Sequence, residues 1–107
     1  MLNQKVCVIG DNCVDFYPKS GKSYVGGNGI NSAIALKRND IDVGYVGVIG
    51  NDEEGELVIA ALEKEDIDFS RVAKLNKKTA WTKIELNKGD RVFVDESLGA
   101  QHKFDLF

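Results

Sequence analysis

Short apolar runs alternate with amphipathic segments over the first 65 residues of the chain. Residues 6–9 form an unbroken apolar run that stops at Gly10, and residues 43–49 form a second run that contains glycines. Apolar runs of this length, rich in β-branched side chains, are typical of fully buried strands in a parallel sheet. A helical pattern follows each run, so the order strand, helix, strand, helix predicts the start of a three-layer α/β fold.

Both helical patterns carry end signals. In the first helix we expect Asn28 to cap the N-terminus, and Asn39 and Asp40 to end the helix, because asparagine tolerates the left-handed conformation of a helix stop. The second helix has an apolar stripe over roughly 54–65. It is preceded at 51–54 by capping and acidic residues, which favour a helix N-terminus.

Two further segments predict small β-hairpins. Residues 14–25 contain two short strand patterns around a turn, and residues 79–95 alternate apolar and polar side chains around Asn-Lys-Gly at 87–89. A three-residue loop in the second hairpin would place Glu85 opposite Arg91, a modest cross-strand pair.

Composition excludes several classes of protein. Apolar residues make up 43% and charged residues 29%, with 17 acidic against 14 basic side chains and a net charge of −3. This slightly acidic composition is unlike that of a nucleic-acid-binding protein, which is rich in basic residues. The run 6–9 is too short for a signal peptide or a membrane span, so we expect a cytoplasmic protein that binds no membrane. Cys7, Cys13 and the only histidine, His102, are too few for a zinc site, and we expect the cysteines to be reduced packing thiols.

The glycine-rich stretch at 26–33 is the strongest candidate for chemistry. Gly26 and Gly27 let a backbone with available amides approach a ligand closely. Asn28 and Asn31 offer carboxamides on adjacent turns, and each both donates and accepts hydrogen bonds, which suits sugar hydroxyls. The alternative, which the stretch on its own favours slightly, is a plain strand-to-helix turn with an asparagine cap.

Two carboxylates follow the first predicted strand. Asp11 and Asp15 lie just beyond its carboxyl end, which is where open α/β sheets bind ligands. A carboxylate accepts hydrogen bonds from two neighbouring hydroxyls at once, so both residues fit polyol recognition. The alternative is an Asx turn with a solvated carboxylate.

Two stretches of the chain resemble phosphate-binding motifs only superficially. Residues 21–23 look like the end of a P-loop, but Phe16 stands where that loop needs its first glycine. The glycines at 26–29 do not continue into a dinucleotide fingerprint, because Ser32 occupies the place of its last glycine.

The stretch 26–33, with Asp40 and Gly50 after it, closely resembles the N-terminal signature of the PfkB, or ribokinase-like, family of sugar kinases. Asp40 is a departure, because the family usually has glycine or serine there. The turn at 50–55 also resembles a family feature, as do Thr79 and the hairpin around 89–93. The resemblance therefore extends over nearly all 107 residues.

The resemblance implies a Rossmann-like three-layer parallel-sheet core of which residues 1–107 are the N-terminal, sugar-binding part, with a lid from 14–25 and 79–95. It implies sugar contacts from five of the residues above: Asp11, Asp15, Gly27, Asn28 and Asn31. Residues 10–18 are most similar to family members that phosphorylate glycated amines such as fructoselysine. A substrate carboxylate would suit Arg91.

The family phosphorylates sugars with ATP and Mg²⁺, using an aspartate in a Gly-Ala-Gly-Asp stretch as base. That stretch does not occur here, so we expect the chain alone to bind no cofactor and to lack kinase activity. Lid hairpins pair in many relatives, so we also expect a homodimer or a self-associating chain. Kinases of fructose, ribose or 2-keto-3-deoxygluconate remain alternatives, as does a non-catalytic sugar-binding or structural module.

Overall fold

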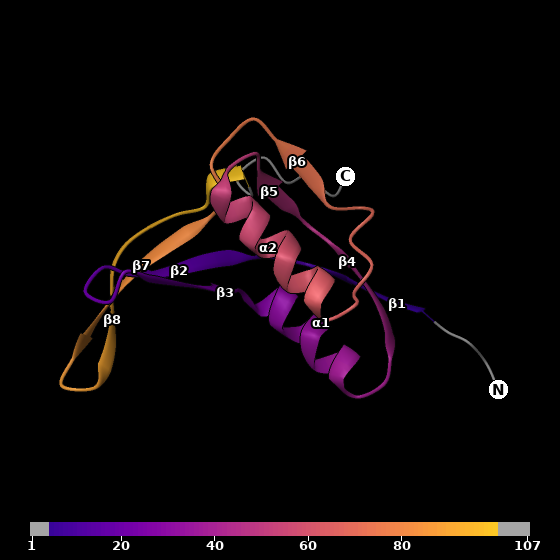
Figure 1. Ribbon diagram of the computed structural model, residues 1–107, viewed down its shortest axis with the longest axis horizontal. Coiled ribbons are helices and arrows are strands. Elements are labelled where there is room, and N and C mark those ends of the chain that lie inside the picture. Colours follow the sequence, from indigo (N-terminus) through magenta and orange to yellow (C-terminus); the bar gives the residue numbers. More distant parts are fainter. Residues whose placement is uncertain (1–4, 101–107) are drawn as a thin grey trace.

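The computed structural model describes residues 5–100, so His102 lies outside the described part. Two helices pack against short strands, and a longer sheet projects to one side (Figure 1). The elements are β1 (Lys5–Ile9), β2 (Cys13–Tyr17), β3 (Lys22–Gly26), α1 (Asn28–Arg38), β4 (Asp42–Val46), β5 (Val48–Gly50), α2 (Glu53–Lys64), β6 (Ala73–Leu75), β7 (Trp81–Asn87) and β8 (Asp90–Ser97).

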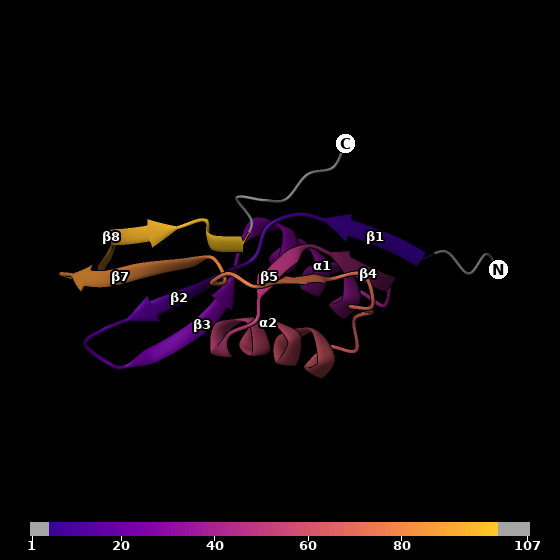
Figure 2. The same cartoon turned by 90° about the horizontal axis from the view of Figure 1, so that it is seen from above.

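The core combines parallel strands with the two helices, which confirms the α/β class. β1 pairs with β4 and β5 pairs with β6, both in parallel. α1 packs against β1 and β4, and α2 packs against β5. The strands β7 and β8 extend away from both helices (Figure 2). The buried cluster of the core contains Ile30 and Ala33 of α1, Val58 and Leu62 of α2, and Tyr45 of β4.

The prediction that the first strand is fully buried is wrong. Val6 and Ile9 are 38% and 54% exposed, and Cys7 is an exposed free thiol. Within residues 5–100, β1 pairs only with β4 and contacts α1, so one edge and the outer face of the strand carry no neighbouring element.

The apolar run at 43–49 forms two strands instead of one. The break falls at Gly47, where a Cβ atom would lie 2.4 Å from the hydroxyl oxygen of Tyr45. β4 stays beside β1, whereas β5 turns away to pair with β6. The buried tyrosine ring therefore requires a glycine at the point where the chain changes sheet.

The helix ends are only partly as expected. Gly27, with φ 107°, occupies the N-cap of α1, and Asn28 is the first helical residue, so the predicted asparagine cap is wrong. At the other end Asn39 is the C-cap with φ −101°, and Asp40 is the left-handed residue with φ 63°. The start of α2 is confirmed, because the Asp52 side chain caps it by accepting a hydrogen bond from the Gly55 amide.

Both predicted hairpins are confirmed, and together they form a four-stranded sheet in the order β3-β2-β7-β8. We call this sheet the lid, after the role that the family resemblance predicts for it. Lys88 and Gly89, with φ values of 52° and 86°, form a two-residue loop. Arg91 consequently lies opposite Leu86, so the predicted Glu85–Arg91 pair does not form. A two-residue loop with positive φ at both positions has the backbone twist that matches the right-handed twist of the flanking strands.

Candidate functional site

Asp11 caps helix α1 from the loop that follows β1. Its carboxylate accepts hydrogen bonds from the amides of Asn28 at 3.2 Å and Gly29 at 2.7 Å. Its main-chain carbonyl accepts another from the amide of Ile30 at 3.1 Å. A negative charge at this place stabilises the positive end of the helix dipole. Asp11 therefore does the work that the sequence assigned to Asn28.

The loop and the helix start are in direct backbone contact. A Cβ atom at Gly27 would lie 2.8 Å from Cα of Asn12, and one at Gly29 would lie 2.7 Å from the Asp11 nitrogen. No side chain fits at either position without moving the backbone. The glycines that were predicted to allow close approach of a ligand thus allow close approach of the neighbouring loop.

A buried network holds this loop from the core side. The Asn12 amide group donates to the Tyr45 hydroxyl at 3.0 Å and to the Val48 carbonyl at 3.1 Å. The Tyr45 hydroxyl donates to the Gly10 carbonyl at 2.7 Å. Burial raises the pKa of Tyr45 to about 12, so the hydroxyl stays a donor at neutral pH. Sequence reasoning missed Asn12 and Tyr45, because no local spacing links residues on different elements.

The lid brings Asp15 and Arg91 together. The Arg91 guanidinium lies 3.7 Å from the Asp15 carboxylate and 5.8 Å from the ring centre of Phe93. Gly26 lies beside the same carboxylate, since a Cβ there would be 3.1 Å from an Asp15 oxygen. Two residues that are 76 positions apart in the sequence therefore meet on one sheet.

The predicted site residues form two neighbouring groups. Asp11, Gly27, Asn28 and Asn31 lie at the start of α1, with both asparagines exposed. Asp15, Gly26 and Arg91 lie on the lid. β2 and β3 connect the groups, because β2 follows the Asp11 loop and β3 leads into α1. A cleft of about 360 Å³ lies between the Asp11 loop and the ends of β7 and β8.

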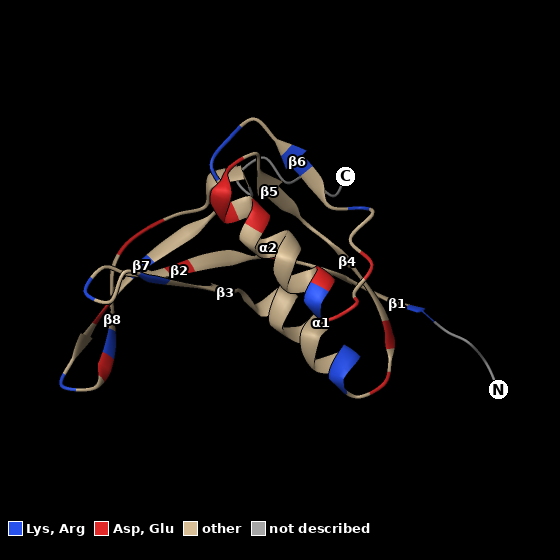
Figure 3. Ribbon diagram, in the orientation of Figure 1, with Lys and Arg blue, Asp and Glu red and all other residues tan. Residues whose placement is uncertain are grey.

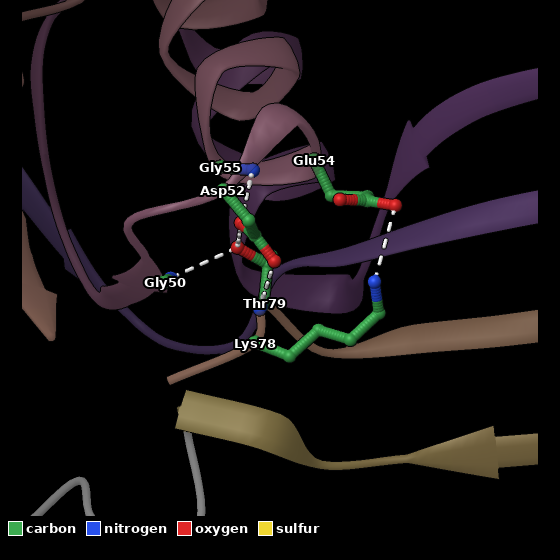
Figure 4. Close-up of polar contacts among 6 residues, drawn as sticks. All are labelled: Gly50, Asp52, Glu54, Gly55, Lys78 and Thr79. Carbon is green, nitrogen blue, oxygen red and sulfur yellow. Dashed lines mark hydrogen bonds and ion pairs between the residues drawn. The ribbon is translucent and has the colours of Figure 1, made fainter. Parts of the chain in front are cut away.

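The root of the lid is fixed by Asp52 and Thr79 (Figure 4). The Thr79 hydroxyl donates to Asp52 at 2.6 Å, the Thr79 amide donates to the other Asp52 oxygen at 2.8 Å, and the Gly50 amide donates to the Thr79 hydroxyl at 2.9 Å. Burial raises the pKa of Asp52, but the hydrogen bonds from Thr79 and Gly55 outweigh it and leave the pKa below its ordinary value. Lys78 and Glu54 form an ion pair beside this network.

Acidic and basic residues both occur on several of the helices and strands, with neither sign confined to one element (Figure 3). Among residues 5–100, no group of three or more histidine, cysteine, aspartate or glutamate side chains is arranged to hold a metal ion. In that same range, neither helix has the length and apolar character needed to cross a bilayer.

Residues 3–105 match the model of the pfkB family of carbohydrate kinases. The chain belongs to this family. It is 38% identical over 101 residues to fructoselysine 6-kinase of Escherichia coli, covering 94% of this chain and 39% of that enzyme. The chain therefore spans well under half the length of this relative.

Solved sugar kinases of the family share the fold. The crystal structure of fructokinase from Xylella fastidiosa with bound ATP matches with a TM-score of 0.84 and 23% identity, covering 96% of this chain and 34% of that one. Ribokinase of Arabidopsis thaliana, complexed with ribose and ATP, matches with a TM-score of 0.80 and 23% identity over 94% of this chain and 37% of the other. The expected ribokinase-like fold is confirmed, and the match covers only the N-terminal part of such kinases.

Proposed function

We propose that the complete protein transfers the γ-phosphoryl group of ATP to a hydroxyl of a sugar or of a glycated amine such as fructoselysine. The observation that carries this proposal is the 38% identity to fructoselysine 6-kinase over 94% of the chain. Membership of the pfkB family supports the reaction class, and the relative supports the substrate.

In this proposal the chain supplies the sugar-binding surface. Asp15 and Asn31 bind substrate hydroxyls, since a carboxylate accepts hydrogen bonds and a carboxamide both donates and accepts them. Asn28 assists them from the same helix start. Asp11 and Gly27 hold the loop and the helix in contact. The Asp11 carboxylate accepts a hydrogen bond from the Gly29 amide, and Gly27 has no side chain to separate the two backbones. The lid residues Gly26 and Arg91 lie beside Asp15.

We assign none of the described residues to ATP, to Mg²⁺ or to the catalytic base. Phosphoryl transfer depends on positioning and on stabilisation of the developing charge. We place the groups that supply both outside this chain, and we therefore propose that residues 1–107 alone have no kinase activity.

A panel of substrates tests the function. The complete protein with ATP and Mg²⁺ is assayed on fructoselysine, fructose, ribose and 2-keto-3-deoxygluconate in a coupled ADP-release assay. The proposal predicts the highest kcat/KM for fructoselysine. Fructokinase is the main alternative, because the fold matches a fructokinase with a TM-score of 0.84, and a preference for fructose would establish it. Binding of a sugar without turnover would instead indicate a non-catalytic module.

A further inference from the structure

Four side chains form one row across the lid sheet, one from each strand. Tyr24 of β3 lies opposite Asp15 of β2, and Asp15 pairs with Thr82 of β7. Thr82 in turn lies opposite Glu96 of β8. Side chains at paired positions of neighbouring strands project to the same face, so Asp15 and Glu96 flank Thr82 at roughly one strand spacing, ~5 Å, on each side.

The carboxylates in and around this row differ in whether a neighbouring group compensates their negative charge. Asp15 is paired with Arg91, and the Asp11 carboxylate is held by two backbone amides at the start of α1. Glu96 has no ion-pair partner within 4 Å among residues 5–100, and its main-chain amide donates to the Asp95 side chain at 2.9 Å. Glu96 is thus the carboxylate of the row whose charge is not compensated by a neighbour.

Glu96 lines the cleft next to the proposed sugar site. Among the described residues, the side chains around this cleft of about 360 Å³ include the carboxylates of Asp11 and Glu96 and the hydroxyl of Thr82, and no lysine or arginine. The Thr82 hydroxyl also lies 3.1 Å from the sulfur of Cys13, another residue that lines the cleft. The cleft therefore offers hydrogen-bond acceptors and negative charge, which suit a cationic donor.

A glycated amine carries such a donor directly beside its sugar hydroxyls. Its nitrogen is attached to a sugar carbon, and an alkylamine is protonated at neutral pH. A neutral sugar such as fructose has only a hydroxyl at that carbon. A carboxylate at the edge of the sugar site therefore distinguishes the two substrates by charge.

We propose that Glu96 is a specificity residue that binds the protonated nitrogen of a glycated amine in this cleft. The inference rests on the proposed function and names what sets its substrate class. Glu96 and Arg91 then have complementary tasks, since the amino-acid part of such a substrate carries a carboxylate as well. A charge-assisted hydrogen bond changes affinity by roughly 10- to 100-fold.

The test compares three substrates in the complete protein. These are fructoselysine, fructose, and a fructoselysine analogue in which an ether oxygen replaces the sugar-linked nitrogen. Glu96→Gln keeps the shape and removes the charge. Glu85→Gln is the matched control, because Glu85 is an exposed glutamate of the same hairpin that does not line the cleft. Circular dichroism verifies that each variant is folded.

We expect Glu96→Gln to reduce the preference for fructoselysine over fructose by roughly 10- to 100-fold, corresponding to one charge-assisted bond. The wild type should bind fructoselysine more tightly than the ether analogue, and Glu96→Gln should abolish that difference. Glu85→Gln should leave the preference unchanged. An unchanged preference in Glu96→Gln, with a wild type that favours fructoselysine, overturns this inference and leaves the proposed function standing. A wild type without that preference overturns the substrate class and the inference with it.

Discussion

The hydroxyl of Thr79 donates a hydrogen bond to the carboxylate of Asp52 over 2.6 Å, and this contact joins the cap of α2 to the root of the lid strand β7. Asp52 also accepts hydrogen bonds from the amides of Gly55 and Thr79. Thr79 is fully buried, so its donors find no water if the carboxylate is removed. One side chain therefore stabilises a helix start and fixes the position from which the lid leaves the core.

Asp52→Ala should be strongly destabilising for that reason. We expect a loss of about 2–3 kcal/mol in the free energy of unfolding, combining a lost helix cap with buried donors left unpaired. Urea denaturation followed by circular dichroism measures it. The matched control is Glu53→Ala, an exposed acidic residue in the first turn of α2, which should cost less than about 0.5 kcal/mol. Equal losses in the two variants would show that the network contributes no special stability.

Stability should fall in acid through the same carboxylate. The pKa of Asp52 is lowered in the folded chain, so its contribution is fully present above the ordinary aspartate value of about 3.9. It is lost as the pH falls through the lower pKa of the folded state. The pKa of Asp68 is also lowered, by its hydrogen bond from Lys5, so the wild type alone does not isolate Asp52. Urea midpoints of wild type and Asp52→Asn between pH 6 and 2 should converge as the pH falls; parallel curves would contradict the prediction.

Asp40→Gly should stabilise the chain. Asp40 has φ 63° at the end of α1, a conformation that costs an L-residue roughly 1–2 kcal/mol, less for aspartate, and costs glycine nothing. After subtracting the greater flexibility of glycine in the unfolded chain, we expect a gain of up to about 1 kcal/mol in the free energy of unfolding. Asp42→Gly, two residues later in β4, is the control and should destabilise. A loss of stability in Asp40→Gly would mean that the aspartate side chain itself supports the turn.

The sequence patterns predicted the structural features that depend on residues close together in the chain. The capping and acidic residues at 51–54, the helices and both hairpins follow from local spacing, and the structure confirms them. The role of Asp11 did not follow, because it depends on a loop meeting a helix that begins 17 residues later. The partner of Arg91 was missed because the hairpin loop is one residue shorter than predicted. The shorter loop shifts the register, so Arg91 lies opposite Leu86 instead of Glu85 and its side chain pairs with Asp15. Long-range hydrogen bonds such as Asn12–Tyr45 leave no periodic signal at all.

The lid should mediate self-association. Apolar side chains at its outer end are exposed, with Phe93 at 65% and Leu86 at 55%, and exposed apolar surface on an edge strand favours pairing with a second copy. We expect a dimer in light scattering at tens of micromolar, and a shift toward monomer in Phe93→Glu. Leu57→Glu, at an exposed apolar position of α2, is the control and should leave the dimer intact. A monomeric wild type would rule out association through the lid.

Arg91→Ala should change substrate preference more than activity in general. In the structure the guanidinium pairs with Asp15 at 3.7 Å, a contact that is partly solvent-exposed and therefore weak. We expect it to bind the carboxylate of the amino-acid part of fructoselysine, because a guanidinium grips a carboxylate with two parallel hydrogen bonds. Losing this contact should lower kcat/KM for fructoselysine by roughly 10- to 100-fold relative to fructose, which has no carboxylate. Arg91→Lys keeps the charge without the paired geometry, so it should fall between wild type and Arg91→Ala. Removing Arg91 also leaves Asp15 without its ion pair, but that change affects both sugars alike and cancels in the ratio. If both substrates lose activity equally in the complete protein, Arg91 serves to hold Asp15 in place and does not read the substrate.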